Sequence, residues 1–186
     1  DKAINTELPH LRLEKAEFAT QVTELAETAW SSHGIDNVTF DVTTNPGQPA
    51  GPINKVASGG ELARLLLALK VALSTSNRVT TLVFDEVDAG VGGATAASVA
   101  ERLSRLSDGV QVLVVTHSPQ VAARGARHLH VIKSIETVDG GDNTVTAVTE
   151  LSVGERREEI ARMLAGATVT EEARAAADSL IEEFSR

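Results

Sequence analysis

Two adjacent carboxylates, Asp85 and Glu86, end the apolar run that begins at Thr80. Such a run predicts a buried strand whose acids lie at the carboxyl edge of a sheet, where α/β proteins bind ligands. Successive side chains of a strand point in opposite directions, so the two acids should have different functions. One could hold Mg²⁺, and the other could orient or deprotonate an attacking water. Taken alone, the pair is equally compatible with two solvated acids.

A serine and two glycines precede an apolar-rich helix that we predict over residues 61–74. The run is Ser58, Gly59, Gly60 and Glu61. Glycines let backbone N–H groups approach a phosphate closely, and the positive end of the helix adds to that attraction. The hydroxyl of Ser58 could donate a further hydrogen bond. The ordinary alternative is a Ser-Gly-Gly turn that only caps the helix.

Two further segments could contribute to the same chemistry. His117 follows the second predicted buried strand, residues 111–116, and could hydrogen-bond a γ-phosphate. The run from Asp88 to Gly93 includes Gly90 and Gly92, whose freedom permits tight turns against another surface. The ordinary alternatives are a loop histidine satisfied by backbone groups and a flexible loop.

The elements that would position these residues alternate between strand and helix, which predicts an α/β fold with a parallel sheet covered by helices. Capping-box patterns begin at Ser152 and Thr168 and predict the starts of two closing helices. The other predicted elements are a helix over 11–33, a strand over 38–42, a loop over 45–52, a helix over 94–106, and a strand pair over 128–133 and 144–151.

Composition excludes several classes of function. The formal net charge of −9 argues against a chain that coats nucleic acid, because phosphate binding needs clustered lysine and arginine. The absence of cysteine excludes disulfides, zinc–thiolate sites and cysteine nucleophiles. No apolar run approaches the roughly 18 residues that a membrane span requires. With aromatic residues at 3%, a base-stacking platform is also excluded.

Taken in order, these segments resemble the second half of an ABC-type ATPase head. Ser58–Glu61 is similar to the signature motif, Leu82–Glu86 to Walker B, and His117 to the switch histidine. Glu61 and Val87 replace the glutamine and proline of transporter subunits and favour the SMC-like branch. Within that branch, the runs VASGGELARLLLALKVAL, TLVFDEVDAGVGG, VLVVTHSPQVAARG and ERREEIARMLAG resemble the RecN family of bacterial DNA repair proteins.

The resemblance implies the C-terminal lobe of a P-loop NTPase-like head, at residues 34–186, preceded at 1–33 by the end of a coiled-coil arm. It implies ATP and Mg²⁺ as cofactors, Asp85 as the metal-positioning acid, and Glu86 and His117 as catalytic residues. Ser58, Gly59, Gly60 and Glu61 would close over ATP held by a second head. Asp88, Gly90 and Gly92 would form a D-loop-like segment, although Gly92 stands where the superfamily usually has aspartate.

The resemblance also implies partners. No G-x-x-x-x-G-K-[ST] motif occurs in the 186 residues, so the N-terminal half of the head would have to supply the phosphate-binding loop. Alone, this chain should hydrolyse ATP negligibly. The other implied partners are a second head in a homodimer and DNA held by the full protein during double-strand break repair. The expected location is the bacterial cytoplasm, in association with the nucleoid, with no membrane contact.

Four alternatives remain open at this point. The chain could come from another SMC-like or ABC ATPase, or it could be a non-catalytic module for head–head interaction. Arg64, one turn into the signature helix, could bridge to phosphate or to a partner, or could form a surface salt bridge with Glu61. Direct DNA contact through a small basic region is a weaker alternative, and its residues are Arg124, Arg127, His128 and His130.

Overall fold

The computed structural model describes residues 1–45, 47–56, 58–73, 80–85, 87–138, 141–166 and 168–183. The chain divides into two compact units, Asp1–Thr116 and His117–Arg186. The first contains α1 (Lys2–Glu7), β1 (Glu17–Glu24), β2 (Asp36–Thr43), β3 (Gly51–Pro52), α2 (Gly59–Leu73), β4 (Thr81–Asp85), α3 (Gly93–Ser107) and β5 (Gln111–Val115). Short 3-10 turns span Pro9–Leu11, Glu27–Ala29 and Ile53–Lys55. The second contains α4 (Pro119–Arg124), β6 (Leu129–Val138), β7 (Gly141–Glu150), α5 (Val153–Ala165) and α6 (Glu171–Glu183).

The N-terminal segment corrects one prediction. Residues 17–24 form strand β1, which pairs antiparallel with β2, so the helix predicted over 11–33 is wrong. Phe18 is opposite Val42, and the rings of Phe18 and Phe40 lie 5.5 Å apart. Phe18, Thr20 and Val22 also recur at every second residue, which is the spacing of a strand. Pairing with β2 makes this segment a strand although its apolar residues also fit the helical spacing. The division into an arm at 1–33 and a head at 34–186 stays a prediction.

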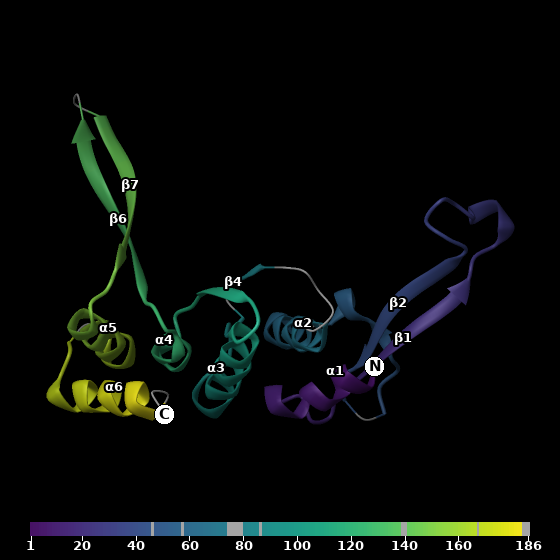
Figure 1. The fold of residues 1–186 in the computed structure, drawn as a ribbon, viewed down its shortest axis with the longest axis horizontal. Helices are drawn as coiled ribbons and strands as arrows, with labels where there is room; N and C mark the ends of the chain where they lie inside the picture. Colours follow the sequence, from purple (N-terminus) through teal and green to yellow (C-terminus); the bar gives the residue numbers. More distant parts are fainter. Residues whose placement is uncertain are drawn as a thin grey trace. The chain divides into compact units, whose positions relative to one another are not determined.

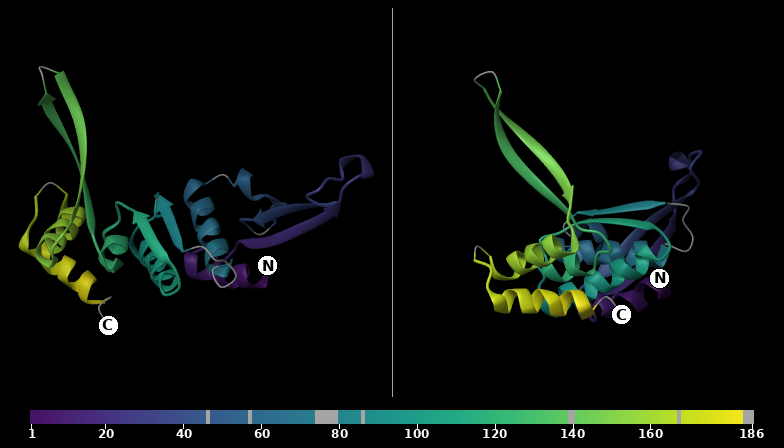
Figure 2. Two further views of the ribbon diagram at one scale, coloured as in Figure 1. Left: turned by 45° about the horizontal axis from the view of Figure 1, so that its top comes forward. Right: turned by 60° about the vertical axis from the view of Figure 1, so that its left-hand side comes forward.

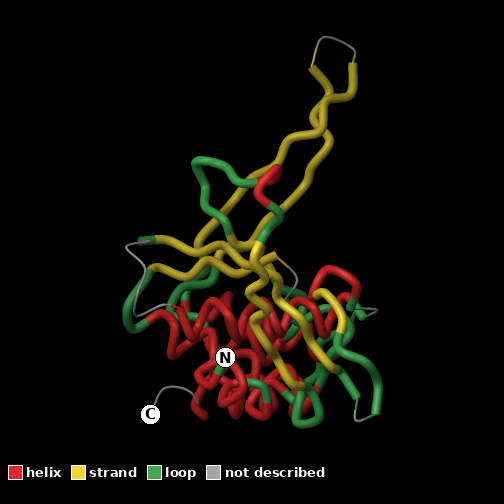
Figure 3. Tube along the Cα trace, turned by 90° about the vertical axis from the view of Figure 1, so that its right-hand side faces the viewer, coloured by secondary structure: helices red, strands yellow, loops and turns green. Residues whose placement is uncertain are grey.

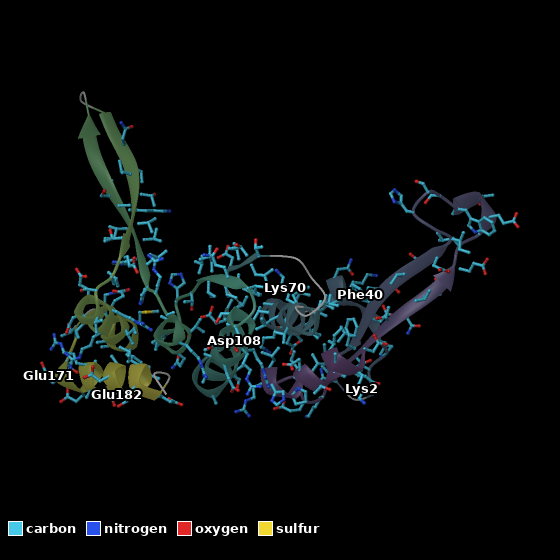
Figure 4. The ribbon with its side chains drawn as sticks, in the orientation of Figure 1. Lys2, Phe40, Lys70, Asp108, Glu171 and Glu182 are labelled. Atoms are coloured by element: carbon cyan, nitrogen blue, oxygen red, sulfur yellow. The ribbon has the colours of Figure 1, made fainter. Side chains whose placement is uncertain are left out.

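The centre of the first unit is a parallel pair, β4 and β5, in which Phe84 is opposite Val114. One face of the pair is turned inward, where Phe84 is only 4% exposed. The Nζ atom of Lys70 in α2, which is labelled in Figure 4, lies 4.8 Å from the centre of the Phe84 ring. This is a cation–π contact between α2 and β4. Helix α3 contacts β5 and follows the turn after β4 (Figure 1). The parallel pair and its helices confirm the predicted α/β class.

The opposite face of the parallel pair is apolar and exposed. Val83, Leu113 and Val115 are 61%, 44% and 54% exposed, and the register puts Val83 opposite Leu113. Parallel strands are normally covered on both faces, so this face is incomplete by the usual rule. The described strands form three sheets, β1-β2-β3, β4-β5 and β6-β7 (Figure 3).

In the second unit, the long hairpin β6–β7 projects from its helices (Figure 2). Helices α4, α5 and α6 pack around a small apolar core of Ala123, Ile160, Ala161, Ala173 and Ala177. Helix α5 begins with the predicted capping box, in which Ser152 accepts from the Glu155 N–H and the Glu155 carboxylate accepts from the Ser152 N–H.

The start of α6 differs from the prediction. Thr170, and not Thr168, receives the first hydrogen bond of this helix, since its hydroxyl oxygen accepts from the N–H of Ala173 at 3.3 Å. Thr168 and Thr170 each precede, by three residues, a residue that can lie in the first turn of a helix. The sequence pattern therefore does not show which of the two threonines is the N-cap. The loop predicted over 45–52 ends earlier than expected, because Gly51–Pro52 form strand β3 and pair with β2. The remaining predicted helices and strands are confirmed with small shifts of their ends, and α4 starts at Pro119 after the N-cap residue Ser118.

Candidate nucleotide site

The start of α2 shows the capping geometry of an ordinary helix end. The Ser58 hydroxyl oxygen accepts from the Glu61 N–H at 3.4 Å, and the Ser58 carbonyl accepts from the Leu62 N–H at 3.0 Å. A hydroxyl that accepts in this way keeps its O–H as a donor. Capping and phosphate binding by Ser58 are therefore compatible.

The two glycines of this segment have different surroundings. A Cβ atom placed on Gly60 would lie 2.7 Å from the carbonyl oxygen of Ala89, closer than real Cβ contacts occur. A Cβ atom placed on Gly59 would meet no atom of the described residues within 4 Å. The start of α2 is thus held against the turn that follows β4, while the outer glycine faces open space. This contact joins the predicted signature motif to the predicted D-loop-like segment.

Arg64 corrects a second expectation. Its side chain is buried, with the residue only 8% exposed, so it does not form the surface salt bridge considered from sequence. Its Nε atom has no hydrogen-bond partner among the described residues. Burial lowers the pKa of Arg64 below its ordinary value, and the nearby charge of Glu61 opposes that shift. The Nη1 atom of Arg64 lies 3.5 Å from the position that a Cβ atom would take on Gly60. The guanidinium group therefore lies next to the contact between α2 and the turn after β4.

Asp88 ties this turn to the second strand of the pair. Its carboxylate is buried and accepts a hydrogen bond from the Thr116 hydroxyl, immediately after β5. Gly90 has a φ of +72°, which few side-chain-bearing residues adopt, so this position needs glycine. Gly92 is extended, with a φ of −145°, and is the N-cap residue of α3. These three D-loop-like residues therefore form one turn from β4 to α3.

Asp85 is the last residue of β4 and is exposed, at the carboxyl end of the parallel pair as predicted. Glu86, the predicted catalytic base, lies outside the described residues. Among the described residues, no group of three or more histidines, cysteines or acids could hold a metal ion. The metal role of Asp85 stays a prediction and would require ligands from elsewhere, such as phosphate oxygens and water.

His117 is exposed and directly follows Thr116, where the second compact unit begins. The next residue, Ser118, is the N-cap of α4, with Pro119 in the first turn. The side-chain oxygen of Gln120 accepts from the Ser118 hydroxyl at 2.9 Å. His117 therefore lies immediately before the N-cap residue of α4, and its predicted contact with a γ-phosphate stays a prediction.

Sequence reasoning missed two partners in this region. The first is Thr116, which holds Asp88; a polar β-branched residue between a strand and a histidine was the available signal. The second is the carbonyl of Ala89, a backbone group that gives no sequence signal at all. Both act on the turn after β4, so the missed contacts are those that fix its position.

In sequence, the chain is similar to RecN DNA repair proteins. It is 41% identical to RecN of Rickettsia bellii over 181 residues and 42% identical to RecN of Halalkalibacterium halodurans over 183 residues, in each case 97% of this chain. It is 49% identical to RecN of Deinococcus radiodurans over 161 residues, or 87% of this chain. The chain spans only 32%, 32% and 26% of the lengths of these relatives. No protein-family model matches it.

In structure, the chain is similar to SMC heads. An Smc head domain with a coiled coil and joint from Pyrococcus yayanosii matches with a TM-score of 0.61 and 19% identity, covering 86% of this chain and 28% of that one. An SMC ATPase studied for ATP-driven dimerization and DNA-stimulated activation matches with a TM-score of 0.50 and 20% identity, covering 90% and 94%. At these identities the likeness establishes the fold, an SMC-type head.

Proposed function

This chain matches the C-terminal part of RecN DNA repair proteins along nearly its whole length, and we propose that it is the signature and Walker B part of an ATP-hydrolysing head. The full protein would act in DNA double-strand break repair and recombination, in association with the bacterial nucleoid. None of the described helices is long and apolar enough to cross a membrane. The observation that carries the proposal is the contact of Gly60 with the Ala89 carbonyl beside an open Gly59.

Each predicted residue has a defined task in this proposal. Asp85 helps to position Mg²⁺ at the carboxyl end of β4, where its exposed carboxylate has room for a cation. Bound there, Mg²⁺ would neutralise charge on the phosphates. Glu86 orients and polarises the attacking water, and His117 donates a hydrogen bond to a γ-phosphate oxygen.

The signature residues act on a second nucleotide. Ser58, Gly59, Gly60 and Glu61 close over the γ-phosphate of ATP that is held by the opposite head. The open surface at Gly59 and the positive end of the 15-residue helix α2 support this part of the proposal, because backbone N–H groups there can approach an anion. The phosphate-binding loop comes from the N-terminal half of the same head, and the turn containing Asp88, Gly90 and Gly92 lies beside the signature segment.

The test compares Glu86→Gln with the wild type in the full-length protein. We expect loss of ATP turnover with ATP binding retained, and accumulation of ATP-bound dimers, because glutamine keeps the shape of the side chain but cannot polarise water as a base. Turnover is measured by phosphate release and dimers by light scattering. The isolated 186-residue chain is the baseline and should release phosphate negligibly.

Three results would contradict the proposal. Wild-type turnover in the Glu86→Gln protein would exclude Glu86 as the base. Normal turnover by the isolated chain would show that its nucleotide site needs no N-terminal half. If the full-length wild type neither binds nor hydrolyses ATP, the chain is instead a module for head–head interaction.

A further inference from the structure

Helix α4 closely follows His117, the residue that is predicted to reach the γ-phosphate. It has six residues, Pro119–Arg124, and begins two positions after His117. A helix this short is not stable in water by itself, because too few hydrogen bonds offset the cost of nucleation. Contacts made by α4 with the rest of the second unit must therefore set the position of the segment that starts at His117.

One of these contacts comes from the side chain of Arg156 in α5. Its Nη2 atom donates to the carbonyl oxygen of Ala123 at 2.7 Å, and the carbonyl of Ala122 lies at 3.4 Å from the same atom. These carbonyls belong to the last turn of α4, where a helix leaves acceptors unsatisfied and carries partial negative charge. The methyl group of Ala123 is also buried against Ile160 of α5.

Arg156 differs from the other arginines of α5 and α6. Arg157, Arg162 and Arg174 each pair with a carboxylate, whereas Arg156 makes no ion pair among the described residues. Its Nε atom is buried and has no hydrogen-bond partner in the described part of the chain, and burial lowers the pKa of Arg156 below its ordinary value. A half-buried cation with no acid beside it raises the free energy of the folded state. The hydrogen bonds from Arg156 to the carbonyls of α4 offset part of this cost.

We propose that Arg156 is a positioning residue: it clamps the carboxyl end of α4 and so holds His117 in place for ATP hydrolysis. This inference rests on the proposed function of His117. It assigns a task to the run from Glu155 to Gly166, which the resemblance singles out but the nucleotide site does not use. Arg156 itself contacts no substrate in this scheme.

The test uses Arg156→Met and Arg157→Met in the full-length protein. Arg157 is the matched control, because its Nε atom donates to a carboxylate oxygen of Asp178 in α6 at 2.6 Å and, among the described residues, it makes no hydrogen bond to α4. We expect Arg156→Met to lower kcat at least about tenfold with the KM for ATP changed less than about twofold, because in the proposed site the phosphate-binding loop of the N-terminal half holds most of the ATP and His117 makes only one contact to the γ-phosphate. Arg157→Met should keep kcat within about twofold, whatever its effect on stability.

Arg156→Lys gives a second readout that a merely structural role would not predict. Its ammonium group can still donate to a helix carbonyl, so kcat should recover partly. Unchanged kcat in Arg156→Met, or equal losses in both methionine variants, would overturn the inference. If Arg156→Met does not fold, the lysine variant decides: kcat at or below that of a His117→Ala protein would overturn the clamp.

Hydrogen exchange separates this inference from the proposed function. In the 186-residue chain, the amides of Ala122 and Gly125, which donate within and just after α4, should exchange faster in Arg156→Met than in Arg157→Met. Equal exchange rates would refute the clamp even if the head is an ATPase. Faster exchange with His117→Ala at wild-type turnover would instead refute the role of His117.

Discussion

Gly59 and Gly60 are adjacent residues of the same type, and only their surroundings distinguish them. Gly60 touches the backbone of the turn after β4, while Gly59 borders open space. A sequence motif presents both as one functional unit. The structure assigns Gly60 to the interior of this chain and leaves Gly59 available to a ligand or partner.

At this residue scale we predict opposite effects of two alanine substitutions. Gly60→Ala should lower the free energy of unfolding by about 1–3 kcal/mol, because its Cβ would overlap a carbonyl that cannot move without shifting the turn. Gly59→Ala should leave stability unchanged or raise it by up to about 1 kcal/mol, since alanine favours helix. Urea unfolding of the 186-residue chain measures both.

The same pair also tests the nucleotide site. In the full-length protein, Gly59→Ala should weaken ATP-dependent dimer formation, since its methyl group would occupy the space through which a phosphate approaches. Equal loss of stability in the two variants would contradict the different packing of the two glycines.

At the scale of elements, periodicity located most helices and strands because their buried faces repeat in sequence. The helix predicted over 11–33 failed because β1 satisfies both periods over a short distance, and a remote partner strand decided between them. The closing helix failed only at its start, where Thr170 and not Thr168 makes the capping bond. Single hydrogen bonds set where a helix begins and ends, and the spacing of apolar residues in the sequence does not show these bonds.

The capping assignment predicts that Thr170→Ala costs about 1 kcal/mol of stability, because the Ala173 N–H loses its acceptor. The matched change Thr168→Ala should stay within about 0.5 kcal/mol of the wild type. Chemical denaturation of the 186-residue chain measures both variants. If Thr168→Ala lowered stability more than Thr170→Ala does, the capping box expected at Thr168 would be correct instead.

At the scale of the whole molecule, the parallel pair β4–β5 is apolar on both faces but covered on one. Val83 and Val114 lie on opposite faces of adjacent strands. Val83 is 61% exposed, whereas Val114 shares the inward face with Phe84. A head whose N-terminal half lies on another part of the protein would supply the missing cover.

The isosteric changes Val114→Thr and Val83→Thr test this arrangement. In the 186-residue chain, Val114→Thr should cost about 1–3 kcal/mol because it buries a hydroxyl, while Val83→Thr should cost less than about 0.5 kcal/mol. Denaturant unfolding measures these values. Adding the N-terminal half of the head should bind the wild type more tightly than Val83→Thr, and equal binding would show that this face is not its contact.

The sequence by itself determined the α/β class and the order of the motifs, because these depend on residue type and local spacing. The roles of Asp85, Glu86 and His117 stay predictions. The sequence also contains no G-x-x-x-x-G-K-[ST] motif in these 186 residues. Only the tertiary structure showed that Gly60 packs against the turn after β4 while Gly59 does not. It also showed that Thr116 donates a hydrogen bond to Asp88 and that Arg156 donates one to the last turn of α4. Those contacts join residues through backbone carbonyls or across long separations, and neither feature leaves a periodic trace in a sequence.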